Sequence, residues 1–150
     1  MRSNIARAAL GLEPGWPSGR APLDIIINYA LHLIGAGLLL FIFFLVYSWA
    51  MPFSEMTLIR QGNVAAALSL GGAMIGFSLT VASGLMHTDR LASFLGWSAA
   101  AAAIQLLTYV LVTRLLHMSK QHIEGNNVAF GLLLASISIS VGVVSAGALS

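Results

Sequence analysis

The chain of 150 residues lacks cysteine altogether, which excludes disulfides, thiol catalysis and metal sites built on thiolates. It also has little charge: Asp, Glu, Lys and Arg make up 8% of the residues, against roughly a quarter in a soluble domain. The seven basic residues are scattered near chain ends and loops, so we expect no nucleic-acid partner. The sequence has no Gly-rich phosphate loop with a lysine and no Ser/His/Asp set, so we expect neither enzymatic activity nor a cofactor.

Hydrophobic residues, by contrast, make up 58% of the sequence. Four stretches lack every charged residue, and each exceeds the roughly 20 residues that a helix needs to cross a bilayer. Backbone groups in hydrocarbon must be paired within the segment, which a helix achieves. The sequence therefore predicts an all-α integral membrane protein, a four-helix bundle with spans at about residues 24–49, 63–86, 91–116 and 127–148.

Residues 1–23 are expected to form an N-terminal extension rather than a cleaved signal peptide. The apolar run begins only after Pro14, Pro17 and Pro22, and it is too long for a signal-peptide core. Two interpretations stay open, a short helix lying in the headgroup region or a frayed terminus. In the first span, residues 38–45 are bulky and apolar all round, so we expect this stretch to face lipid or a partner.

The second span carries small residues at every fourth position, which we call the ladder: Gly72, Gly76, Thr80 and Gly84. Small residues let the backbones of membrane helices approach closely, so the ladder is expected to contact another helix. In the third span, Ser98 is followed by five alanines, which offer a second close-packing surface.

When the chain is aligned with itself at a displacement of 64 positions, residues 63–65 match the identical residues 127–129. The ladder then aligns with a row that begins with Ser136 and Ser140. This match predicts two tandem repeats, residues 24–90 and 91–150, with two helices each. Because two spans return the chain to the same side, both repeats enter the membrane in one orientation, related by an axis along the membrane normal. The alternative is that any two helices rich in small residues align.

The residues at these joints resemble a known family. Ile-Arg-Gln-Gly-Asn-Val-Ala-Ala-Ala-Leu-Ser-Leu-Gly-Gly-Ala at 59–73, with a Glu-Gly-Asn-x-Val-Ala copy at 124–129, is similar to the bacterial inner-membrane proteins grouped as domain of unknown function 350. The resemblance covers about residues 24–150 and implies a duplicated pair of helices in the bacterial inner membrane. It implies no activity, so it assigns no catalytic residues. The chain departs from the family in its doubled asparagine and its longer N-terminal segment.

Polar residues inside the spans are candidates for an intramembrane site: Asn28 and His32 in the first span, Gln105 and Thr108 in the third. An ionisable residue within a span is a functional hypothesis by default. The alternative for His32 is a neutral ring hydrogen-bonded to a neighbouring helix.

Asparagines at the starts of the second and fourth spans are predicted helix N-caps: Asn63, Asn126 and Asn127. The alternative is that these helix ends contact an anion or a lipid headgroup. His117, His122 and Glu124 lack the spacing of a zinc site, so we expect no metal.

From these features we expect a small membrane subunit with a structural or assembly role, in a homo-oligomer or as an accessory chain of a larger complex. Its expected partners are the lipid bilayer and other membrane subunits or copies of itself. The alternative is a small channel or transporter whose pathway forms in the oligomer, lined by the intramembrane polar residues and by the serines of the fourth span. The basic residues near the span ends slightly favour an orientation with both termini outside.

Overall fold

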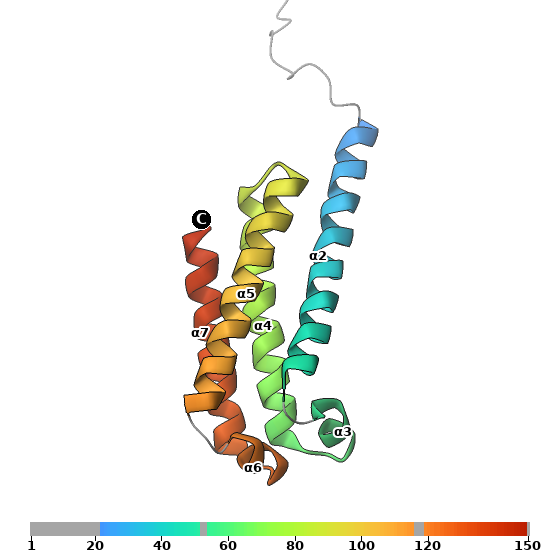
Figure 1. The fold of residues 1–150 in the computed structure, drawn as a ribbon. Helices are drawn as coiled ribbons and strands as arrows, with labels where there is room; N and C mark the ends of the chain where they lie inside the picture. The colour runs from blue at the N-terminus through green and yellow to red at the C-terminus, as the bar shows by residue number, and fades with distance from the viewer. Residues whose placement is uncertain (1–21, 52–53, 116–118, 150) are drawn as a thin grey trace, which may run out of the picture. The chain divides into compact units, whose positions relative to one another are not determined.

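The computed structural model describes residues 22–51, 54–115 and 119–149 (Figure 1). These residues form six helices and no strand: α2 (Pro22–Ala50), α3 (Glu55–Arg60), α4 (Val64–His87), α5 (Leu91–Leu115), α6 (Ser119–Glu124) and α7 (Val128–Ala148). Four of them, α2, α4, α5 and α7, are long and apolar enough to cross a membrane. The predicted all-α architecture with four spans is confirmed. The expected interfacial helix of the extension lies outside the described residues.

The chain divides after Leu31 into two parts, and each is described by itself. The described residues of the first part are the opening turns of α2, where Ile25, Ile26 and Ile27 are all more than half exposed. The second part runs from His32 to Ser150 and contains the rest of α2 and every other helix.

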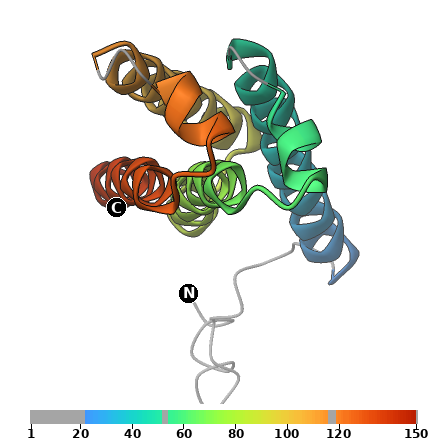
Figure 2. The same cartoon turned by 90° about the horizontal axis from the view of Figure 1, so that it is seen from below.

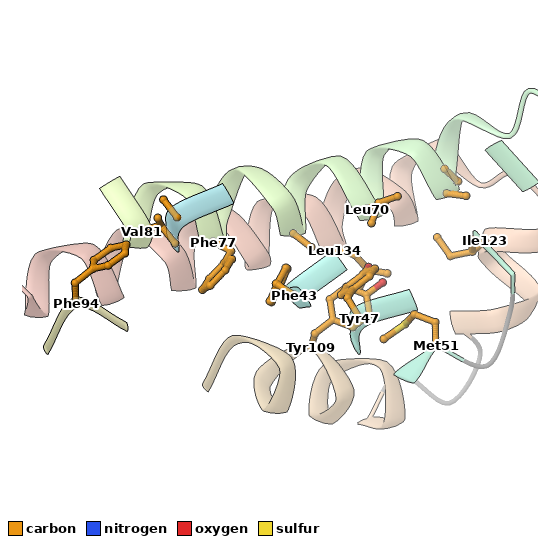
Figure 3. Packing of buried hydrophobic residues seen from close by; sticks show 14 residues of the cluster. Phe43, Tyr47, Met51, Leu70, Phe77, Val81, Phe94, Tyr109, Ile123 and Leu134 are labelled. Carbon is orange, nitrogen blue, oxygen red and sulfur yellow. The ribbon is translucent and has the colours of Figure 1, made fainter. Parts of the chain in front are cut away.

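Within the second part, α4 lies between α7 and α2 (Figure 2). Aromatic rings join α4, α5 and the later turns of α2: Phe43 stacks on Phe77 with 4.4 Å between ring centroids, and Tyr47 meets Tyr109 edge-on at 4.8 Å (Figure 3). The expectation that residues 38–45 face lipid or a partner is therefore wrong for Phe43, which is 2% exposed and packs within the chain, although Phe41 is 58% exposed. A run that is apolar all round cannot reveal which side meets a partner helix.

The joints before α4 and α7 have the same construction. The short helices α3 and α6 correspond residue for residue, because adding 64 to the first and last residue numbers of α3 gives those of α6. In each joint the residue before the N-cap has a positive φ, 82° at Gly62 and 55° at Asn126. Glycine adopts this left-handed conformation freely and asparagine more readily than most residues. The doubled asparagine thus fills a position at which the first repeat uses glycine.

Candidate functional site

The central contact of the bundle is between α4 and α7. A Cβ added at Gly131 would lie 2.7 Å from Ala65 Cα, one at Gly72 would meet the Ala135 backbone, and one at Gly142 would meet the Gly76 backbone. The opposed positions rise together along both helices, so α4 and α7 run parallel. Helix backbones touch here, which only small residues allow.

Hydroxyls reinforce the same contact. Thr80 Oγ1 donates to the Gly142 carbonyl at 3.1 Å, and Ser83 Oγ donates to the Ala146 carbonyl at 2.7 Å. The ladder is thus divided: Gly72, Gly76 and Thr80 face α7. A Cβ at the fourth member, Gly84, would instead lie 3.2 Å from the Phe94 ring of α5.

Ser136 and Ser140 do not belong to this contact. Both are exposed, and their hydroxyls donate to the carbonyls of Leu132 and Ser136 on their own helix at 2.9 and 2.8 Å. The face that α7 presents to α4 is Gly131, Ala135, Ser138, Gly142 and Ala146. Since each residue turns a helix by about 100°, that face lies almost opposite the row that contains the two serines. Repeat alignment alone does not reveal which face of a helix is inward.

The three asparagines tie the two joints together. Asn63 Oδ1 accepts from the Ala66 amide at 2.9 Å, and Asn127 Oδ1 accepts from the Phe130 amide at 3.2 Å, as N-caps do. Asn63 Nδ2 also donates to the Ile123 carbonyl at 2.7 Å, and Asn126 Oδ1 accepts from the Ala65 amide at 3.0 Å. Each joint therefore supplies a hydrogen bond to the other, and two of the first amides of α4 already have protein partners.

Within the second part of the chain, the structure does not bring the predicted intramembrane residues His32, Gln105 and Thr108 together. The His32 side chain is 7% exposed and its ring lies 5.8 Å from the Phe94 ring. Gln105 lies about three turns further along α5, where its Nε2 donates to the Ala73 carbonyl at 2.8 Å. Thr108 Oγ1 donates to the Ile104 carbonyl of its own helix. Asn28 belongs to the part of the chain before His32 and is half-buried.

A buried polar cluster lies instead at the end of the bundle near α3, formed by Tyr47, Glu55, Ser69 and Tyr109 (Figure 3 labels the two tyrosines). The Tyr47 hydroxyl donates to Glu55 Oε1 at 3.1 Å and lies 3.2 Å from Ser69 Oγ. Ser69 Oγ in turn shares a hydrogen bond with the Tyr109 hydroxyl. Four helices, α2, α3, α4 and α5, thus meet through one chain of oxygen atoms.

The Glu55 carboxyl is the unusual member of this cluster. It is 2% exposed, and its Oε2 has no hydrogen-bond partner among the described residues. Burial raises the pKa of Glu55 from 4.5 to about 8, although the hydrogen bond from Tyr47 works in the opposite direction. The sequence alone did not single out Glu55. Its position a few residues past Pro52 and the end of a span, in a chain with five acidic residues, was the available signal.

No group of three or more His, Asp or Glu residues that could hold a metal ion is present in the described part of the chain. His122 stacks on Phe130 with 4.9 Å between ring centroids, and Glu124 pairs with Lys120 at 3.8 Å. His117 lies outside the described residues.

The family described as Domain of Unknown Function (DUF350) matches residues 21–149. UPF0719 inner membrane protein YjfL of Escherichia coli (strain K12) is 23% identical over 128 residues, which cover 85% of this chain and 97% of that protein. UPF0719 transmembrane protein YshE of Bacillus subtilis (strain 168) is 26% identical over 125 residues, covering 81% and 93%. No solved structure matches the chain. The resemblance read from residues 59–73 and 124–129 is confirmed.

Proposed function

We propose that this chain, which belongs to the DUF350 family and is a multi-pass bacterial inner-membrane protein, is a structural subunit of a homo-oligomer. In this proposal each chain joins the next by repeating the α4–α7 contact between copies. One observation carries the proposal: the outward faces of α4 and α7 are the repeat equivalents of the two faces that meet inside the chain.

The match can be followed position by position. The inward face of α7 has Gly131, Ala135, Ser138, Gly142 and Ala146, and 64 positions earlier α4 has Ala67, Gly71, Met74, Ser78 and Ala82. All five of these α4 residues are exposed or half-buried, and a Cβ added at Gly71 would meet nothing within 4 Å. The inward face of α4 has its own equivalents in the exposed serines of α7, Ser136 and Ser140.

Helices α5 and α2 show the same correspondence between an exposed face and a face that is buried within the chain. The exposed row on α5, which includes Gly96 and Ala99, corresponds to His32 and Gly35 of α2. His32 is buried beside Phe94, and a Cβ at Gly35 would lie 3.4 Å from the Leu95 side chain. A Cβ at Gly96 would meet nothing within 4 Å. This α5 row, like most of the α4 face, consists of small residues, and Gly96 and Ala99 are both exposed.

An interface between two different faces is heterologous, and repeating it builds a ring when the rotation closes. The parallel orientation of α4 and α7 suits a ring whose axis lies along the membrane normal. Exposed small residues also fit such contacts, because dispersion and weak hydrogen bonds between close backbones hold membrane helices together. The transport alternative gains no support from His32 and Gln105, which lie in separate places.

Disulfide mapping tests the proposal, because the chain has no native cysteine. One tagged chain with Gly71→Cys and a second with Ser136→Cys are co-expressed in the native membrane and oxidised. The intrachain contact of Gly72 with Ala135 predicts that these two positions meet between copies, within the roughly 4.4–6.8 Å between Cα atoms that a disulfide allows. Ser78→Cys with Ser140→Cys is a second matched pair, equivalent to Gly142 and Gly76.

The control keeps the same faces and changes the register. Ala82→Cys with Ser136→Cys is displaced by eleven residues from the matched pair, roughly 16 Å along the helix. We expect cross-links in both matched pairs and none in the control, and a mass of several identical chains after extraction in mild detergent. Monomers without cross-links, or a stoichiometric set of other subunits, would contradict the homo-oligomer.

A further inference from the structure

The Glu55 carboxyl has a geometry that suits a neutral acid better than an anion. An ionised carboxylate has about four acceptor positions, and here one hydrogen bond, from Tyr47, reaches it from the described residues. Among those residues no lysine, arginine or histidine forms an ion pair with it. A buried charge with so little compensation is strongly unfavourable, and the group takes up a proton instead.

We propose that Glu55, with the hydroxyls of Tyr47, Ser69 and Tyr109, is a proton-binding site that takes one proton per chain from bulk water. On binding, one carboxylate oxygen of Glu55 gains an O–H bond, and no other covalent bond changes. On release, the proton returns to water and the carboxylate is left in place. This site is independent of the proposed oligomer contact.

The hydroxyl chain explains how both states are accommodated. Each of the three hydroxyls carries one donor and can also accept, so the direction of the chain of hydrogen bonds can reverse. When Glu55 is ionised, Tyr47 donates to it and Ser69 and Tyr109 can donate in sequence behind. When Glu55 is protonated, its own O–H can donate to the Tyr47 hydroxyl, and the direction of donation along the chain of hydrogen bonds is reversed.

The groups that face Glu55 from the neighbouring helices are Tyr47 on α2, Ser69 on α4 and Tyr109 on α5. Phenols ordinarily titrate near pH 10, so both tyrosines remain donors across neutral pH. On its own helix, Arg60 is exposed, and on α6 Lys120 pairs with Glu124. Burial raises the pKa of Glu55 to about 8, which means that the proton is bound at neutral pH and released in mild alkali.

Infrared difference spectroscopy of the purified full chain, in mild detergent, reads the site directly. The carbonyl stretch of a protonated carboxyl is expected to disappear with a midpoint near pH 8. Glu55→Gln should abolish that transition. Glu124→Gln is the matched control, because its side chain is 46% exposed and its loss should leave the transition unchanged.

Tyr47→Phe distinguishes a proton site from a purely structural cluster. The Tyr47 hydrogen bond favours the charged carboxylate, so its removal should move the midpoint to higher pH. A structural role alone would lower stability and leave the midpoint unmoved, which would overturn the proposal. The proposal also fails if no carboxyl of the wild-type chain titrates above its ordinary range near 4.5, or if the transition survives in Glu55→Gln.

Discussion

Two adjacent glycines of α4 allow the α4–α7 contact to be measured with one methyl group. A Cβ at Gly72 would meet the Cα and carbonyl carbon of Ala135, whereas a Cβ at Gly71 would meet nothing within 4 Å. Overfilling a packed contact typically costs about 1–3 kcal/mol, and here the obstacle is backbone, which moves least. Replacing glycine by alanine in a helix also gains about 1 kcal/mol from helix propensity, equally at both positions.

The difference between Gly72→Ala and Gly71→Ala therefore isolates the contact with α7. We expect Gly71→Ala to keep or slightly raise the free energy of unfolding. The free energy of unfolding of Gly72→Ala should be about 1–3 kcal/mol lower than that of Gly71→Ala. Alanine also stands at position 135, the repeat equivalent of Gly71, so it suits that face. The assay is unfolding in mixed detergent micelles followed by far-ultraviolet circular dichroism. Equal free energies of unfolding for the two variants would refute the close backbone contact.

Three further outcomes are expected. Gly71→Leu should dissociate the proposed oligomer, measured by mass in mild detergent, while helix content is retained. Gly76→Leu would push against the Ser138 backbone and should reduce both the oligomer and the helix content. Asn126→Ala should cost roughly 1–2 kcal/mol more than Asn126→Gly, since both lose the bond to the Ala65 amide and alanine alone is strained at φ 55°. The folded-state pKa of Glu55 is raised from 4.5 to about 8. The contribution of this carboxyl to the free energy of unfolding is therefore complete below pH 4.5. It is lost as the pH rises to 8, by at most about 5 kcal/mol. Unfolding of Glu55→Gln should be flat across that range, and a wild-type profile that is equally flat would contradict the buried carboxyl.

The sequence predicted the number of spans, the ladder and the helix caps at Asn63 and Asn127 because each has a local physical cause. The cap predicted at Asn126 is wrong, because this residue precedes the cap and has a positive φ of 55°. Span length follows from bilayer thickness, and Asn63 and Asn127 cap helices through amides three residues away. The facing of each helix could not be predicted in the same way. In lipid both sides of a span are apolar, so Phe43 and Phe41 look alike in sequence although one is buried and the other exposed.

The buried polar cluster was missed for a different reason. Its members lie on four helices, and 40 positions separate Ser69 from Tyr109, so no spacing pattern joins them. The short helix α3 has six residues, too few to show a helical period. Only the folded chain brings a carboxyl from a joint against hydroxyls from three spans.

The two repeats differ in one chemical respect. At the displacement of 64, Tyr47, Glu55 and Ser69 correspond to Leu111, Ser119 and Leu133, so the second repeat has no counterpart of the carboxyl. In the proposed ring, halves with and without a counterpart of Glu55 would alternate, so that each Glu55 would be separated from the next by a half that lacks this buried carboxyl. Because both halves belong to one polypeptide, that alternation would be obligatory in the proposed ring.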